Sequence, residues 1–341
     1  MPTLTPPLGL YSRIKREIVE VITMNLFNLR LSMLGTVALI ITVSTLGLGA
    51  ILSVMGSLSI YTLVVVVAIF NVAQWLLAPY LIKSLYGVRP LEPGENPQLQ
   101  QTIQELSARS GIRTPKLMIS KLPIPNAFAY GSPFTGSHVA VTQGLLETLD
   151  QEEVEAVVGH ELGHIKNRDV QIMMFVSFLP SLFYILARSM LFSRYYGGRD
   201  RRGTGGLAIV GGLSMLVYFF LLIFNLGFSR LREYYADQHA AGIVEDGARK
   251  LSEGLAKIST STARVRATTR GATAHSGFKA LFISDPDRAI RDAAELQSFY
   301  GGGDDELVRN IVNRRLTTLD SLGELFSTHP NIVKRLRALQ G

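Results

Sequence analysis

The chain contains 341 residues with a formal net charge of +7 at pH 7, and only 18% of them are charged, against about a quarter in ordinary soluble domains. Its mean hydropathy of +0.24 excludes a disordered chain, which would combine low hydrophobicity with high charge. The absence of cysteine excludes disulfides, a thiolate zinc site and a cysteine nucleophile. No basic stripe interleaved with aromatic residues occurs in the sequence, so we expect no nucleic-acid partner.

Three uncharged runs divide the chain into apolar and polar parts. Residues 31–82, 170–187 and 203–229 together make 97 positions without a charge, so the other 244 carry all 61 charges, which is 25%. That fraction is ordinary for a soluble domain. The composition therefore predicts a soluble domain with membrane segments inserted into it.

Residues 1–30 form a charged segment before the first apolar run. They carry too many charges for a cleavable signal peptide, and the apolar run behind them is too long. Apolar side chains recur at helical spacing and predict an amphipathic helix: Ile14, Ile18, Val21, Ile22 and Leu26. Such a helix either lies on the membrane surface or packs on the soluble domain.

The first apolar run is long enough for two membrane spans, because one span needs about 20 apolar residues. We expect a transmembrane hairpin at 31–82, with spans at 33–55 and 58–82. A helical pair buried in a soluble core is the alternative, but soluble helices seldom stay uniformly apolar for this length. Proline, glycine and charged residues return abruptly after Lys83 and indicate the start of a soluble domain.

The segment 84–169 is predicted to form the first part of this domain. Pro97 at a first helical position, with Asn96 as its cap, predicts a helix that ends at Gly111. Three short β signals separated by turns then predict a small sheet, with strands at 116–119, 126–131 and 138–142.

A second hydrophobic hairpin interrupts the domain. Asp150 followed by Glu153 predicts a capped helix, which we expect to run through Asp169 directly into the apolar stretch at 170–187. The stretch at 203–229 likewise continues into a polar helix.

The remainder, 230–341, is predicted to form the second part of the domain and is mostly helical by pattern. Loops are expected at 259–277 and 301–303, and 285–318 is interpreted as an added helical pair.

Two of the six histidines fall in the pentapeptide His160-Glu161-Leu162-Gly163-His164. Positions i and i+4 share one face of a helix, so both imidazoles can bind one ion. Glu161 can reach the open side of that ion and accept a proton from the attacking water. The motif alone also occurs in proteins that bind no metal, but here it follows short strands on a strongly capped helix.

A catalytic zinc needs a third protein ligand and one open position. Without cysteine, we expect one zinc ion per chain with Glu233 as the third ligand, and Asp237 one turn on, holding a ligand histidine by its second nitrogen. The alternative is a solvated acidic pair with Arg230 and Arg232 as surface partners. Two apolar stretches separate His164 from Glu233, and an even number of spans returns the chain to the side that it left.

In four blocks the sequence resembles the HtpX-like family of membrane-bound zinc metalloproteases, relatives of the eukaryotic CAAX prenyl protease. The blocks are NAFAYG at 126–131, HELGHIKNRD at 160–169, SRLREYYAD at 229–237 and STHP at 327–330. The resemblance implies an α+β, mainly helical integral membrane protein with four hydrophobic helices and a gluzincin-type metalloprotease domain that contains a small β-sheet. It implies that the zinc ligands are His160, His164 and Glu233. It also implies Glu161 as the general base and Asp237 as a supporting carboxylate.

The resemblance also assigns roles to two other segments. It implies that one segment forms an edge strand, to which an extended peptide substrate adds through main-chain hydrogen bonds. The residues of this strand are Asn126, Ala127, Phe128 and Ala129. His329 is implied to return to the metal and donate to the oxyanion, with a structural cap before the last helix as the alternative. Tyr130 and Asn331 stand where the family more often has Thr and Pro.

The implied function is hydrolysis of peptide bonds in membrane or misfolded proteins, as part of membrane-protein quality control. Basic residues before the first span and Lys83 after the second favour a multi-pass protein of the cell membrane, with its site on the cytoplasmic side near the bilayer surface. Five arginines between the third and fourth apolar stretches oppose this orientation, unless that hairpin does not fully cross. Alternatives are an intramembrane-cleaving metalloprotease and an inactive protease-like scaffold, and the sequence does not indicate the oligomeric state.

Overall fold

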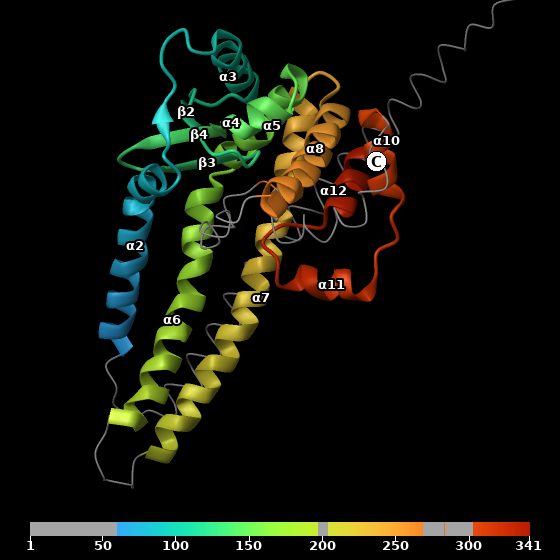
Figure 1. The fold of residues 1–341 in the computed structure, drawn as a ribbon. Helices are drawn as coiled ribbons and strands as arrows, with labels where there is room; N and C mark the ends of the chain where they lie inside the picture. The colour runs from blue at the N-terminus through green and yellow to red at the C-terminus, as the bar shows by residue number, and fades with distance from the viewer. Residues whose placement is uncertain (1–59, 197–203, 269–282, 284–302) are drawn as a thin grey trace, which may run out of the picture.

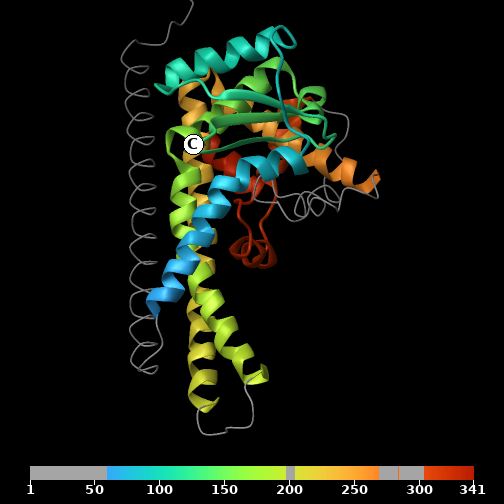
Figure 2. The same cartoon turned by 90° about the vertical axis from the view of Figure 1, so that its left-hand side faces the viewer.

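The computed structural model of the protein describes residues 60–196, 204–268, 283 and 303–341 (Figure 1). A mainly helical body carries a long helical hairpin that projects from one end (Figures 1 and 2). The amphipathic helix predicted within 1–30 and the span predicted at 33–55 lie outside the described residues.

The projecting hairpin consists of α6 (Asp169–Tyr196) and α7 (Thr204–Ile243), which pack along each other. Among the described residues, two segments are long and apolar enough to cross a membrane, Asp169–Leu191 and Ala208–Ile243. In an apolar 18-residue window of each, only 35% and 28% is buried inside the protein, whereas a core helix of a soluble protein would be mostly covered. The second predicted hairpin therefore has the length and the exposed apolar surface of a membrane hairpin.

The predicted span at 58–82 is also helical, as α2 (Ile60–Leu85). Beside the body, α2 lies next to α6 and contacts both that helix and the sheet (Figure 1). The prediction of four membrane helices is thus supported for the second hairpin and stays a prediction for the first.

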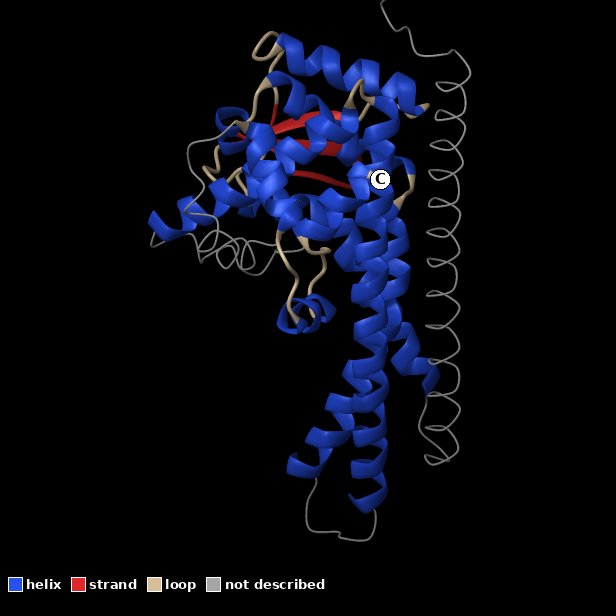
Figure 3. Ribbon diagram, turned by 90° about the vertical axis from the view of Figure 1, so that its right-hand side faces the viewer, coloured by secondary structure: helices blue, strands red, loops and turns tan. Residues whose placement is uncertain are grey.

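A small mixed sheet lies among the helices of the body (Figure 3). Its strand order is β1-β2-β4-β3, with β2 parallel to β4 and the other pairs antiparallel. This arrangement leaves β3 at an edge of the sheet within the described residues. The three predicted strands are confirmed to within two residues at each end, and a short first strand is added: β1 (Arg89–Pro90), β2 (Lys116–Ser120), β3 (Ala127–Ser132) and β4 (Gly136–Thr142).

Helix α5 (Gln151–Lys166) begins with the predicted capping box, in which Asp150 and Glu153 satisfy each other's backbone amides. It packs against β3, α7, α8 (Gly247–Thr268) and the predicted helix α3 (Pro97–Ser110), and its apolar face joins the main core. A Cβ at Gly163 would lie 3.0 Å from the Cα of Ala236 on α7. Glycine at this position therefore allows α5 and α7 to approach closely where the two histidines lie.

A turn separates α5 from α6, so the prediction of one helix running through Asp169 is wrong. Asn167 caps α5, and Arg168 adopts a left-handed conformation with φ of 55°. In a continuous helix, positions 164 and 169 would point about 140° apart around the axis. The turn changes the chain direction and allows the first residue of α6 to face the last turn of α5.

The C-terminal part adds α10 (Asp304–Asn313), α11 (Thr318–Leu325) and α12 (Ile332–Gln340), while α4 (Gln143–Thr148) links the sheet to α5. The loop predicted at 259–277 is wrong for 259–268, because α8 continues to Thr268 and the hydroxyl of Thr260 donates back to the Ala256 carbonyl at 3.0 Å. Of the predicted helical pair at 285–318, α10 lies within the described residues.

Candidate metal centre

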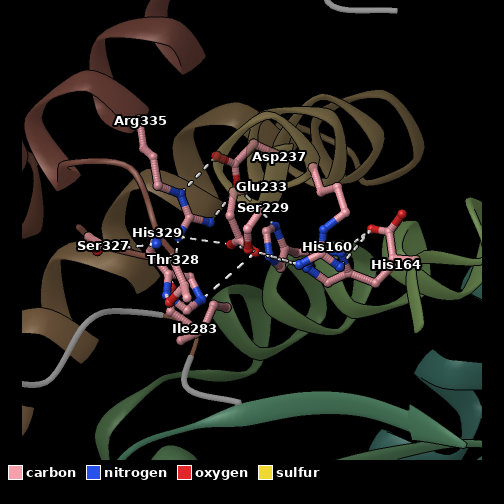
Figure 4. Close-up of polar contacts among 12 residues, drawn as sticks. His160, His164, Ser229, Glu233, Asp237, Ile283, Ser327, Thr328, His329 and Arg335 are labelled. Carbon is pink, nitrogen blue, oxygen red and sulfur yellow. Dashed lines mark hydrogen bonds and ion pairs between the residues drawn. The ribbon is translucent and has the colours of Figure 1, made fainter. Parts of the chain in front are cut away.

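Three side chains predicted as zinc ligands meet at the junction of α5 and α7 (Figure 4). His160 and His164 project from one face of α5, and Glu233 approaches from α7. The Nε2 atoms of His160 and His164 each lie 3.5 Å from a carboxylate oxygen of Glu233. One nitrogen or oxygen atom from each residue can be chosen so that all lie within 4.8 Å of one another. This is the separation expected of ligands around a single ion.

The unsatisfied polar atoms of this cluster support a metal site. His160 is fully buried and Glu233 nearly so. His160 Nε2 and Glu233 Oε2 face each other at 3.5 Å, too far for a good hydrogen bond, and neither has another hydrogen-bond partner among the described residues. Buried polar atoms are rarely left unpaired, and two imidazoles with one carboxylate form the donor set of a catalytic zinc site. The residues therefore fit a zinc ion.

Asp237 takes the position that its spacing from Glu233 predicts. Its Oδ1 lies 2.9 Å from His160 Nδ1, the ring nitrogen other than the one that faces Glu233. Arg335 on α12 donates to both Asp237 oxygens, at 2.9 Å from Nε and 2.6 Å from Nη2. A histidine held by a carboxylate at Nδ1 presents Nε2 as the ligand atom.

Sequence reasoning did not identify Arg335. It contacts Asp237 from almost one hundred positions away and lies 3.5 Å from Glu233, fully buried. A signal was available in the sequence, because Arg335 shares a helical face with Ile332, Leu336 and Leu339, which are core residues. A charged side chain on an apolar face indicates a buried ion pair.

Asp169 also had no predicted role. Its Oδ2 lies 2.6 Å from His164 Nδ1, so each histidine has its own carboxylate partner. Arg232 on α7 approaches the same oxygen at 3.8 Å. This contact depends on the left-handed turn at Arg168, which the sequence pattern did not indicate.

Glu161 lies beside the histidines and is almost fully buried. Burial raises the pKa of Glu161, while the nearby His164 and His160 and the backbone of Ala129 act in the opposite direction. A carboxyl group with a raised pKa is a better proton acceptor and donor near neutral pH. Glu161 therefore has the environment of a general base.

The histidines open onto a cavity of about 260 Å³. Ala127, Phe128 and Ala129 from β3 line it, together with α5, α6, α7 and the segment before α12. Asn126 does not line the cavity: its side-chain oxygen accepts a hydrogen bond from the Ile283 backbone at 2.9 Å. Asn126 thus holds a second wall of the cavity, since Ile283 is one of the lining residues.

His329 also reaches the cavity, as the resemblance implied. Its Nε2 lies 3.8 Å from Glu233 Oε1, and its Nδ1 lies 2.9 Å from the Thr328 hydroxyl. The backbone amide of His329 donates to Ser327 at 3.2 Å. The cap of α12 is instead Asn331, whose side chain accepts from Val333, so the capping role considered for His329 is wrong.

The remaining described histidines do not line the cavity. His138 stacks on Tyr130 in the sheet, with ring centroids 4.8 Å apart, and His239 Nε2 lies 3.0 Å from the Ser110 hydroxyl. His275 lies outside the described residues.

The charges of the cluster point to a divalent cation. Four carboxylates that are at most 3% exposed surround the histidines, namely Glu161, Asp169, Glu233 and Asp237. Two guanidinium groups, of Arg232 and Arg335, lie beside these carboxylates and partly balance their charge. With all four carboxylates ionised and both histidines neutral, as metal ligands must be, two negative charges remain that these guanidinium groups do not balance. Buried charges are stable only when they are paired or bind a metal.

Comparison with known proteins agrees with this geometry. A model of peptidase family M48 matches residues 93–341. A protease HtpX homologue of Thermoplasma acidophilum is 33% identical over 331 residues, which cover 93% of this chain and 98% of that protein. Another, of Pyrobaculum calidifontis, is 37% identical over 278 residues, covering 81% of this chain and 76% of that one.

Among solved structures, the chain resembles the crystal structure of S. mikatae Ste24p, with a TM-score of 0.52 and 18% identity. The match covers 91% of this chain and 65% of that one, and at this identity it shows a shared fold. The family model and the relatives identify the same family, and the shared fold is consistent with it. The chain belongs to peptidase family M48, among the HtpX-like proteases.

Proposed function

We propose that the protein is a membrane-bound, zinc-dependent endopeptidase. The observation that carries the proposal is the buried cluster of His160, His164 and Glu233 beside Glu161, at a cavity bordered by an edge strand. The family and the printed names of the relatives support a protease. The donor set supports zinc as the metal, one ion per chain.

In this mechanism His160, His164 and Glu233 would hold the zinc ion, which when bound polarises the scissile carbonyl and the attacking water. Glu161 removes the proton of that water and later delivers it to the leaving amine. Its burial supports both steps, because the raised pKa brings the carboxyl group closer to neutral pH. His329, whose Nδ1 contacts Thr328, directs Nε2 to the cavity, where it would donate to the oxyanion.

Strand β3 is proposed to bind the substrate. It is an edge strand, and Ala127 and Ala129 are small residues that line the cavity. An extended peptide can add to such an edge through main-chain hydrogen bonds, as a further strand. Pairing of this kind accepts many side chains, which suits a protease that acts on diverse polypeptides.

The proposed substrates are membrane proteins or misfolded proteins, in a quality-control role. Support comes from the position of the site, because Asp169 is both a partner of His164 and the first residue of the membrane-length helix α6. The site therefore lies at the base of the hairpin, where exposed loops of neighbouring membrane proteins would be within reach. The distribution of basic residues around the first two predicted spans supports the cytoplasmic side of the cell membrane.

The test separates the enzyme from an inactive scaffold. Glu161→Gln in the full chain, purified in detergent, should abolish cleavage of a casein-type substrate while zinc content stays at one ion per chain, because Glu161 is not a proposed ligand. The matched control is Glu152→Gln, an exposed position on the same helix, and it should keep full activity. Wild-type activity should disappear with a chelator and return with zinc. Retained cleavage in Glu161→Gln would refute the proposed base, and absence of metal-dependent cleavage in the wild type would favour the scaffold.

A further inference from the structure

Helix α11 carries an apolar stripe that is largely exposed. The exposed fractions are 79% for Leu319, 54% for Leu322, 40% for Leu325 and 60% for Phe326, which follows the helix. Positions three and four residues apart share a helical face, so these side chains form one surface. The acidic residues of the helix, Asp320 and Glu324, lie on the other side. A helix of this composition needs an apolar partner on one face.

The stripe continues onto the apolar surface of the hairpin. The ring of Phe326 lies 6.4 Å from that of Phe219 on α7, centroid to centroid. Leu216, Phe219 and Phe220 are exposed within the segment of α7 that is long enough to cross a membrane. Figures 1 and 3 show α11 on an excursion of the chain away from the body, at the level of the hairpin. One exposed apolar surface therefore runs from α7 onto α11.

The position of this contact along α7 fits the edge of a bilayer. The helix carries no charge before Arg230. Phe219 precedes Arg230 by eleven positions, which is about 16 Å along the axis. Interfacial helices bury their apolar face about 5–10 Å into the boundary between headgroups and acyl chains. The end of α11 is hydrogen-bonded to Arg230 and the Phe326 ring contacts Phe219, so α11 lies within the stretch that extends about 16 Å from the first charge of α7, and this stretch includes the boundary.

Hydrogen bonds connect the end of α11 to the catalytic cavity. Arg230 Nη1 donates to the carbonyl oxygens of Glu324 at 2.7 Å and Ser327 at 2.9 Å. The Glu324 side chain in turn accepts from the backbone amide of Asn331 at 3.2 Å. His329 lies between these anchors in the chain. The position of α11 is therefore coupled to that of His329.

We propose that α11 and Phe326 lie in the membrane interface on the catalytic side, as a lipid-binding helix that holds the His329 segment at the bilayer surface. Lipid is the proposed partner of the stripe because the stripe is continuous with the exposed apolar surface of α7, in the segment that is long enough to cross a membrane. The ends of the helix agree with this placement: Thr317 and Asp320 form a capping box that satisfies the first backbone amides. Arg315, exposed just before the helix, suits anionic headgroups.

The chain has no cysteine, so single cysteines can be labelled without a background. Leu322→Cys would carry an environment-sensitive fluorophore, and the full-length protein would be reconstituted in phosphatidylcholine–phosphatidylglycerol vesicles with and without doxyl lipids. The matched control is Ser321→Cys on the same helix, about 100° around the axis from Leu322. Gln101→Cys on α3 serves as a water-exposed reference and Phe220→Cys on α7 as a lipid-exposed one.

We expect doxyl groups near the headgroup to quench the label at 322 at least twofold more strongly than the label at 321. For the label at 322, doxyl groups near the headgroup should also quench more strongly than doxyl groups deep in the acyl chain. A label at 322 that behaves like the one at 101 would overturn the proposal. So would a label that is shielded from water but not quenched by lipid, because that result would indicate a second copy or another protein on the stripe. The measurement requires no catalysis, so its failure is distinct from a failure of the proposed function.

Discussion

The hydrogen bond between Asp169 and His164 gives the most informative mutation. Asp169→Asn keeps the size of the side chain and removes the negative charge that faces His164 Nδ1 at 2.6 Å. Hydrogen bonds to charged groups contribute about 1.5–3 kcal/mol. Since each 1.4 kcal/mol changes a binding constant tenfold, zinc affinity should fall by about 10- to 100-fold. Arg232, which lies 3.8 Å from the same oxygen, loses a charged neighbour as well. The loss of zinc affinity should therefore be nearer about 100-fold than about 10-fold.

The assay is competition for zinc between the purified protein and a fluorescent chelator, followed by cleavage rates at saturating zinc. Glu152→Gln makes the same carboxylate-to-amide change on an exposed part of α5 and should leave zinc affinity unchanged. Thermal unfolding of both variants in the presence of zinc controls for a general loss of structure. A zinc affinity for Asp169→Asn within twofold of the wild type would refute the reasoning that this carboxylate orients His164.

Three further changes test the fold around the site. Arg168→Gly should stabilise the protein by about 0.5–1 kcal/mol, seen as a higher Tm, because glycine adopts the left-handed turn without the strain of a side chain; a lower Tm would contradict this. Lys257→Met should destabilise it by about 3 kcal/mol in chemical unfolding, since Lys257 lies 2.8 Å from the buried Glu153. Burial already raises the pKa of Glu153, and loss of Lys257 raises this pKa further. The loss of stability in Lys257→Met should therefore shrink as pH falls and Glu153 is protonated. An equal loss of stability at pH 5 and pH 8 would contradict this prediction. Gly163→Val should separate α5 from α7 and reduce zinc binding at least tenfold, whereas the exposed Gly212→Val, with nothing within 4 Å of its Cβ, should not.

The sequence predicts those parts of the site that depend on local spacing. Two histidines one turn apart define their own shared face, and the even number of apolar stretches explains how Glu233 returns to them. The capping box at Asp150 and the strand boundaries also follow from local rules.

Two supporting contacts could not be predicted in this way. Asp169 meets His164 because one non-glycine residue adopts a left-handed conformation, against its intrinsic preference. Arg335 meets Asp237 through the packing of α12 on the core, across nearly one hundred residues. Periodicity places Arg335 on an apolar face and so indicates a buried partner, but tertiary packing determines which residue that partner is, and it also determines the contact of Asp169 with His164.

The distribution of the ligands along the chain has a consequence for biogenesis. His160 and His164 are synthesised before α6, and Glu233 only in the second half of α7, after the uncharged stretch at 203–229. During synthesis the third ligand is missing until the apolar stretches of both helices have been made, and it meets the histidines only when α7 packs against α5. A nascent chain that ends before the second half of α7 therefore has two of the three ligands and, we expect, no proteolytic activity. The order of the elements would by itself delay activation until both apolar helices of the hairpin have been synthesised.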